Sequence, residues 1–98
     1  MFVLETPHNI ARELAARVRK LRLARGWSQD ELADRAGVAF STLRLFEQTG
    51  QISLERLLML ATALKAVDAF EGLFMPPPAA HLEDLVSRTK LRQRGRRR

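Results

Sequence analysis

The 98-residue sequence has no cysteine, four prolines and no long run of apolar residues. Without cysteine there can be no disulfide, no thiolate metal site and no cysteine nucleophile. No apolar run approaches the roughly 20 residues needed to cross a bilayer. The opening "MFVLE" lacks the basic region and cleavage site of a secretory signal. These absences predict a cytoplasmic protein with no membrane partner, and its length suits one small domain.

The side chains that enzymes use are also sparse. The two histidines, His8 and His81, are far apart in the sequence, and neither has a second metal ligand at a suitable spacing. There is no glycine-rich phosphate loop and no nucleophile beside a base. The acids of "QDELAD" lie where a helix begins, and the helix dipole explains them. The sequence therefore predicts no enzymatic activity, no metal and no cofactor.

The charge is distributed unevenly along the chain. The formal net charge is +6, yet residues 88–98 hold seven basic residues and no acid, whereas residues 1–87 hold 10 basic and 11 acidic residues. A basic tail attracts polyanions, usually nucleic acid, although it can also be a solubilising extension. Such a tail binds phosphates without choosing a sequence. The candidates for non-specific phosphate contacts are Arg92, Arg94, Arg96, Arg97 and Arg98.

Helical periodicity predicts three helices in the first half of the chain. The first begins at Thr6, a capping hydroxyl followed by proline, and ends at Gly26. In "WSQDEL", Ser28 caps the second helix over residues 29–36, and Glu31 is expected to reach back and complete a capping box. The third helix covers about residues 40–48. The core-facing positions expected from helical spacing are Ile10, Leu14, Val18, Leu21, Leu32, Ala33, Ala36, Leu43 and Phe46.

Two further helices are predicted downstream. Ser53 caps the fourth helix and Asp68 caps the fifth. Met59 and Leu60 widen the apolar surface of the fourth helix beyond one core-facing stripe, which predicts a contact with another copy of the chain. The core positions expected on the fourth helix are Leu54, Leu57, Leu58, Ala61 and Leu64. The fifth helix carries Phe70, Leu73 and Phe74, whose apolar surface is also expected to contribute to a dimer.

The chain is predicted to divide after the fifth helix. The run "MPPP" stops that helix because proline lacks an amide proton and restricts the residue before it. Beyond it, residues 81–91 are predicted to form a short amphipathic helix that precedes a disordered basic tail. The predicted fold is therefore all-α, with a compact five-helix domain over residues 1–75 and a proline-started segment over residues 76–98.

The second and third helices have the spacing of a helix-turn-helix. A short turn built on Gly37 and Val38 joins residues 29–36 to residues 40–48. In this motif the second helix enters the major groove of DNA, and only its outward side chains reach base edges. The first helix crosses the DNA backbone, where Gln29 can form a hydrogen bond with a phosphate. The motif predicts binding to double-stranded DNA.

Residues 18–64, "VRKLRLARGWSQDELADRAGVAFSTLRLFEQTGQISLERLLMLATAL", resemble the Cro/C1-type (XRE) helix-turn-helix family of phage and bacterial repressors. The pattern "STL..FE.TG.ISLE.LL" is further similar to the HipB-like branch, whose members are antitoxin autorepressors paired with HipA-like kinase toxins. The resemblance implies a lambda-repressor-like fold and a bacterial, nucleoid-associated transcriptional repressor. It also implies a homodimer on a palindromic operator and a HipA-like kinase toxin as partner.

The resemblance also implies roles for individual positions. Gln29 would hold a phosphate. Arg22 and Glu47 would form an ion pair between helices, whose partial exposure would make its net contribution to stability small. Phe40, Ser41 and Leu45 would face the bases, and Thr42 and Arg44 would lie nearby, against the DNA backbone or the bases.

Phe40 and Leu45 depart from the family pattern, in which base-facing side chains are often polar. Three interpretations stay open at this point. The two side chains pack on thymine methyl groups in the major groove; they turn inward, with the helix phase shifted by about one residue; or they form an exposed apolar patch that contacts a protein. Arg44 is then the best candidate for a polar contact with DNA.

Two other functions compete with a repressor. A protein-interaction module, with weak or no specific DNA binding, would neutralise or scaffold a partner through the third helix or the C-terminal segment. RNA binding through the tail is less favoured, because the basic segment has no aromatic side chains on which bases could stack.

Overall fold

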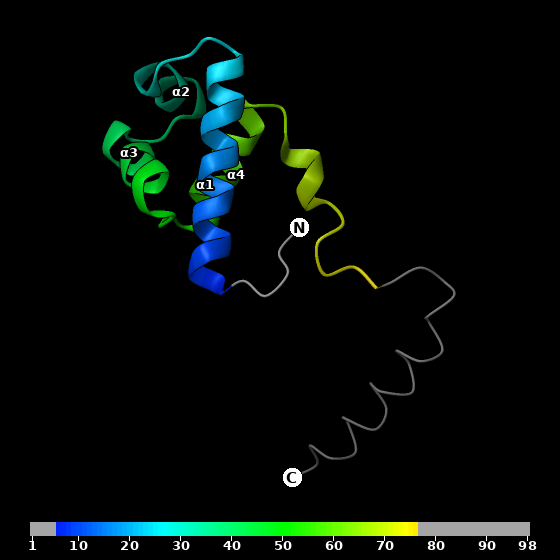
Figure 1. Ribbon diagram of the computed structural model, residues 1–98. Helices are drawn as coiled ribbons and strands as arrows, with labels where there is room; N and C mark the ends of the chain where they lie inside the picture. The colour runs from blue at the N-terminus through cyan, green and yellow to red at the C-terminus, as the bar shows by residue number, and fades with distance from the viewer. Residues whose placement is uncertain (1–5, 77–98) are drawn as a thin grey trace, which may run out of the picture.

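A computed structural model describes residues 6–76, and every regular element in that range is helical (Figure 1). The all-α prediction is confirmed. The predicted helix over residues 81–91 and the five tail arginines lie outside the described residues, as does all of the predicted segment 76–98 except Pro76. The elements are α1 (Pro7–Ala24), α2 (Gln29–Ala36), α3 (Phe40–Thr49), α4 (Leu54–Ala63) and the short 3-10 helix η1 (Val67–Phe70).

Three helices begin at hydroxyl caps, as predicted. Thr6 and Ser28 each accept a hydrogen bond from the backbone amide three residues later, at 3.1 Å, and Ser53 does the same at 3.2 Å. The capping box was predicted only half correctly. The Glu31 carboxylate accepts a hydrogen bond from Arg35 at 3.1 Å rather than from the backbone of Ser28. An exposed arginine one turn away competes successfully for this carboxylate.

Left-handed glycines end α2 and α3. Gly37 has φ +76° and Gly50 has φ +86°, a region that other residues rarely adopt. A Cβ atom at Gly50 would lie 2.9 Å from backbone atoms of Ala11 and Arg12. The end of α3 therefore touches the backbone of α1, and only glycine permits this close approach.

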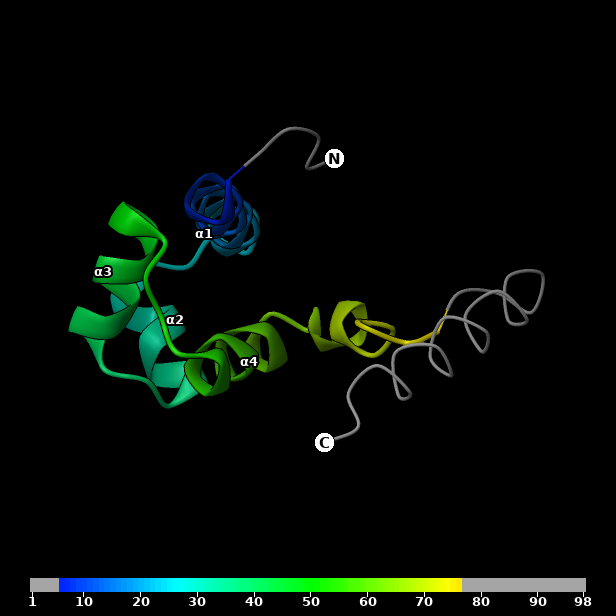
Figure 2. The same cartoon turned by 90° about the horizontal axis from the view of Figure 1, so that it is seen from below.

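The helices enclose one core. α1 packs against α3, while α2 packs against both α3 and α4. The largest fully buried side chains are Leu32, Leu43, Phe46 and Leu60. Viewed along α1, α3 and η1 lie on opposite sides of the domain (Figure 2). Within residues 6–76, no helix is long and apolar enough to span a membrane.

The predicted core faces of α1 and α4 were partly wrong. Leu21 is exposed, whereas Ala15 and Arg22 are buried. On α4, Leu54 is exposed and Leu60 is fully buried. Apolar residues are so dense on both helices that their spacing does not define one face. The packing of α1 on α3 and of α4 on α2 selects the buried side instead.

The predicted fifth helix is a single 3-10 turn. Asp68 lies in its first turn and does not cap it, since residue 66 precedes the helix and is an alanine. Leu73 and Phe74, which were expected on this helix, lie beyond its end and are exposed. Phe74 has φ +61°, which interrupts a helix directly before Met75 and Pro76.

Candidate nucleic-acid interface

The turn between α2 and α3 is anchored in the core. The amides of Gly37 and Val38 both donate to the carbonyl of Ala33, at 2.9 Å and 3.1 Å. The Val38 side chain is buried and belongs to the core cluster. This anchoring holds α2 and α3 at one angle, which a helix-turn-helix requires if its second helix is to enter a groove.

A buried ionic cluster joins α1, α2 and α3. The guanidinium of Arg22 donates to both carboxylate oxygens of Glu47, from Nε at 2.8 Å and from Nη2 at 3.0 Å. Arg22 Nη1 also donates to the carbonyl oxygen of Trp27 at 2.8 Å. The amide of Gln29 donates to Glu47 Oε1 at 2.9 Å. One carboxylate therefore ties together a residue from each of two other helices.

The burial of this cluster corrects one expectation. The side chains of Arg22 and Glu47 are only 8% and 3% exposed, whereas the sequence had suggested partial exposure. A buried, bidentate pair is costly to break, because either partner alone would be an uncompensated charge away from water. The pair therefore orients the helices, and removal of either partner would be strongly destabilising.

Gln29 lies at the first position of α2 and is half-buried. One of its two amide hydrogens is used by the bond to Glu47, which leaves the second hydrogen. Gln29 is not among the residues that line the outer surface of α3. The structure thus links Gln29 to the buried cluster.

The outward face of α3 is a shallow concave surface of about 310 Å³. Phe40 and Leu45 are 42% and 47% exposed there, so the inward-turned interpretation of these two residues was wrong. Ser41, Arg44 and Gln48 follow each other at intervals of three and four residues and form a polar stripe along the helix. Phe40 and Leu45 lie on the two sides of this stripe. Among the described residues, these five form the whole lining of this concave surface.

Gln48 was not predicted from the sequence as a DNA-binding residue, and Thr42 was predicted to lie near the DNA backbone or the bases. Gln48 lines the concave surface, whereas Thr42 is half-buried and does not. The signal for Gln48 was available, since it lies four residues after Arg44 and shares its face. Thr42 lies roughly 100° around the helix from Ser41, which turns it toward the flank.

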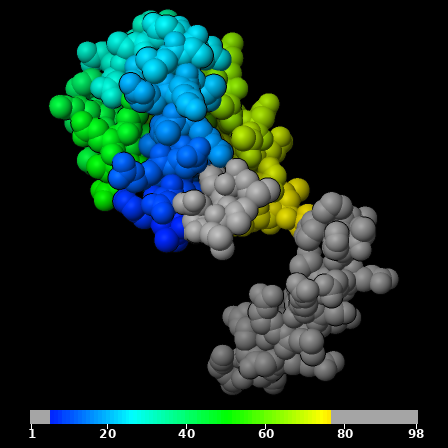
Figure 3. Space-filling model, viewed as in Figure 1, coloured from blue at the N-terminus to red at the C-terminus, as the bar shows by residue number. Residues whose placement is uncertain are grey.

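Two cations of α1 lie close to the end of α3. Arg12 and Arg19 line a second concave surface, of about 160 Å³, together with Gln48, Gly50 and other residues of α1 and α3. Both arginines are exposed. In the space-filling view, α1 covers the front of the domain between α3 on the left and η1 on the right (Figure 3). Basic side chains thus adjoin one end of the outward face.

The comparison with known families agrees with this geometry. A model of the helix-turn-helix family matches residues 18–71, more than half of the chain. The chain therefore belongs to the Cro/C1-type (XRE) helix-turn-helix family. It is a DNA-binding protein of the transcription-regulator kind. No curated protein matches the chain. Among residues 6–76, no group of three or more histidine, aspartate or glutamate side chains is arranged to hold a metal ion.

Proposed function

We propose that this chain is a transcriptional repressor that binds a palindromic operator as a homodimer. One α3 would lie in the major groove of each half-site. The observation that carries the proposal is the outward face of α3, where Ser41, Arg44 and Gln48 are exposed in one stripe. The opposite face of the same helix is fixed by buried Leu43 and Phe46. A rigid helix with an exposed polar stripe suits direct readout of base edges.

The polar side chains divide into two groups by what each can contact. Arg44 can donate two hydrogen bonds to a guanine, and Gln48 can make a bidentate contact with an adenine. Ser41 can contact either type of base. Gln29 and Thr42 lie off the outward face, so they are assigned to the DNA backbone, where contacts set the register of the protein.

Phosphate attraction would come from cations outside the stripe. Arg12 and Arg19 adjoin the end of α3. The tail arginines add positive charge with no acid among residues 88–98. These contacts release counterions and are independent of sequence.

Truncation after Ser87 should therefore weaken binding to every DNA alike and reduce its salt dependence. An unchanged salt slope would exclude the tail from the DNA interface.

The support for a dimer is an apolar groove between α1, α4 and η1. It has a volume of about 190 Å³, and its lining includes Leu14, Leu21, Leu57, Leu64 and Phe70. α3 and η1 lie on opposite sides of the domain, so a second copy seated here would leave both recognition helices uncovered (Figures 1 and 2).

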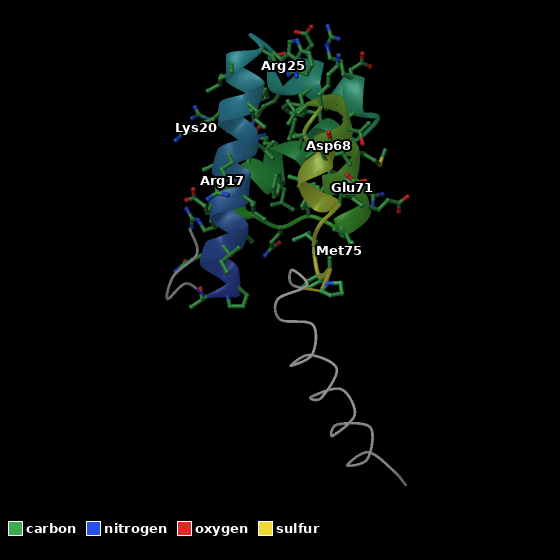
Figure 4. The ribbon with its side chains drawn as sticks, turned by 90° about the vertical axis from the view of Figure 1, so that its right-hand side faces the viewer. Arg17, Lys20, Arg25, Asp68, Glu71 and Met75 are labelled. Carbon is green, nitrogen blue, oxygen red and sulfur yellow. The ribbon has the colours of Figure 1, made fainter. Side chains whose placement is uncertain are left out.

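The charges beside this groove are self-complementary. Figure 4 shows the cations Arg17, Lys20 and Arg25 along α1, and the acids Asp68 and Glu71 on η1 and the turn that follows. Arg17 is also paired with Glu13, and Arg25 donates to the carbonyl of Leu64. A two-fold axis brings the same patch of both copies together, so the basic side of each copy would meet the acidic side of the other. The occupant that we propose for the groove is therefore a second copy of the chain.

The dimer can be tested with matched leucine substitutions on α1. Leu21 and Leu23 are both exposed, but only Leu21 lines the groove. Leu21→Glu should convert the dimer to a monomer at micromolar concentration, while Leu23→Glu should leave the dimer intact. Light scattering or sedimentation measures the mass. A wild-type protein that is a strict monomer, or a dimer unaffected by Leu21→Glu, would contradict this interface.

DNA binding can be tested by gel shift with genomic fragments, including the DNA upstream of the gene. Wild-type protein should shift one or a few fragments specifically. Arg44→Ala should lose about 10- to 100-fold in specific affinity with its fold intact, in keeping with the loss of one bidentate base contact. Lys65→Ala is the control, since Lys65 is an exposed cation beyond the end of α4, on the connection to η1. Equal binding by both variants would show that α3 does not read the operator.

The HipB-like resemblance adds a partner to the proposal. As an antitoxin autorepressor, the chain would bind a HipA-like kinase toxin encoded by a neighbouring gene, in a bacterial cytoplasm where it meets the nucleoid. A pull-down with the product of that gene tests this pairing. A stable complex without any DNA shift would favour the second candidate, a protein-interaction module, for which the exposed Phe40 and Leu45 are the supporting observation.

A further inference from the structure

Phe40 and Leu45 are large apolar side chains that remain on the outward face of α3. They share this face with Ser41, Arg44 and Gln48, which can hydrogen-bond base edges. Phe40 and Leu45 have no hydrogen-bonding group in their side chains. In the major groove of DNA the group that offers apolar contact is the C5-methyl of thymine.

We infer that Phe40 and Leu45 each contact the C5-methyl group of a thymine in the operator half-site. This inference rests on the proposed DNA binding and deepens it, because it specifies two of the base pairs that the operator contains. Each contact removes one thymine methyl group from water, which accounts for the preference for thymine over cytosine or uracil. A half-site with cytosine or uracil at either position would leave an apolar side chain facing polar base edges.

The helix geometry sets the spacing of the two thymines. Phe40 and Leu45 are five residues apart, which corresponds to about 7.5 Å along an α-helix. Base pairs are stacked about 3.4 Å apart, so the two contacts fall about two base pairs from each other.

The same helix geometry determines on which DNA strand each thymine lies. Five residues correspond to a rotation of roughly 140° around the helix axis, which puts the two side chains on opposite sides of the polar stripe. A helix in the major groove turns one side toward each strand. The two thymines therefore lie on opposite strands.

The position of α3 leaves little freedom for another arrangement. Leu43 and Phe46 are 0% and 1% exposed and fix the inner side of the helix. At its end, Gly50 is in close approach to the backbone of α1. The hydroxyl of Thr49 donates to the carbonyl of Leu45 at 2.7 Å and holds the last turn. Side chains on a helix held in this way meet bases in a fixed register.

The test uses wild-type protein and chemically altered DNA. The operator half-site is first mapped by footprinting on a fragment that the protein shifts. Each thymine is then replaced singly by deoxyuridine, which removes only the methyl group. Replacement of either inferred thymine should weaken binding about three- to five-fold, and replacement of both should weaken it about 10- to 20-fold. Deoxyuridine outside the half-site is the control and should have no effect.

Two variants then assign each thymine to one side chain. Phe40→Ala should bind more weakly and lose its sensitivity to deoxyuridine at one position only. Leu45→Ala should do the same at the other position, about two base pairs away and on the opposite strand. Because both side chains are exposed, circular dichroism is expected to show an unchanged fold for both variants.

The outcomes separate this inference from the proposed function. Specific binding that is insensitive to deoxyuridine throughout the half-site would overturn the thymine contacts and leave the repressor proposal standing. Failure to shift any fragment would overturn DNA binding itself. Variants that bind the operator like wild type but lose a protein partner would overturn the inference and assign the face to that partner.

Discussion

The two faces of α3 carry the same kinds of side chain in opposite surroundings. The inner face has Leu43 and Phe46, and the outer face has Leu45 and Phe40. Both inner side chains are almost completely buried, whereas both outer ones are more than 40% exposed. Residue type therefore does not distinguish a buried position from an exposed position on this helix. The position around the helix axis distinguishes them.

The charged residues of α3 follow the same division. Glu47 on the inner side is buried and has three donors from Arg22 and Gln29. Arg44 on the outer side is exposed. A buried charge must have its partners inside the protein, whereas an exposed arginine is hydrated and can bind an anionic ligand from solution. The inner charge thus serves the fold, and the outer charge is available for DNA.

The largest expected loss of stability follows from removal of the inner charge, Glu47. Glu47→Ala leaves the Arg22 guanidinium buried without its carboxylate and should lower the free energy of unfolding by about 3–5 kcal/mol. The matched control is Glu13→Ala, which removes an exposed ion pair with Arg17 and should cost at most about 1 kcal/mol. Urea denaturation followed by circular dichroism measures both. Similar losses for the two variants would mean that burial does not strengthen the inner pair.

The next prediction compares the loss of stability at two leucines that are two residues apart on α3. Leu43→Ala creates a cavity in the core and should cost about 2–5 kcal/mol. Leu45→Ala, on the outer face, should change stability by no more than about 0.5 kcal/mol. Thermal or urea unfolding of the two variants checks the difference. A large loss for Leu45→Ala would show that this side chain supports the fold and would weaken its assignment to DNA.

The smallest effect falls on Gln29, which is connected to the inner cluster but is half-exposed. Gln29→Ala removes one hydrogen bond to a carboxylate and should lower the free energy of unfolding by about 1.5 kcal/mol. Gln29→Glu should be more damaging, because it brings a second carboxylate beside Glu47. Denaturation of both variants tests this order. If the alanine variant is the less stable of the two, the bond to Glu47 is not the main role of Gln29.

The local signals in the sequence predicted helix boundaries well. The second helix was expected over residues 29–36, and α2 spans Gln29–Ala36. Ser28 and Gly37 explain this agreement, because a cap and a left-handed glycine act within one turn of the helix end. The turn between α2 and α3 was predicted from the same kind of local information. The family pattern over residues 18–64 also lies inside the 18–71 match.

The same reasoning predicted burial poorly where many residues are apolar. Leu21 and Leu54 were expected in the core and are exposed, while Leu60 was expected at the surface and is buried. Helical spacing cannot choose one face of a helix that is apolar on several sides. The choice depends on the helix that packs against it. Gln48 is a different case, since its spacing of four residues from Arg44 was sufficient to place it on the same face of α3.

Short-range chemistry was therefore sufficient to place the three hydroxyl caps, the turn and the helix-turn-helix order in this chain. Contacts between distant residues were needed for the rest. Arg22 and Glu47 are 25 residues apart, and their burial exists only once three helices meet. The exposure of Phe40 and Leu45 likewise follows from the packing of the opposite face of α3. A hydrogen bond at a helix end forms within one turn, whereas exclusion of water requires the assembled core.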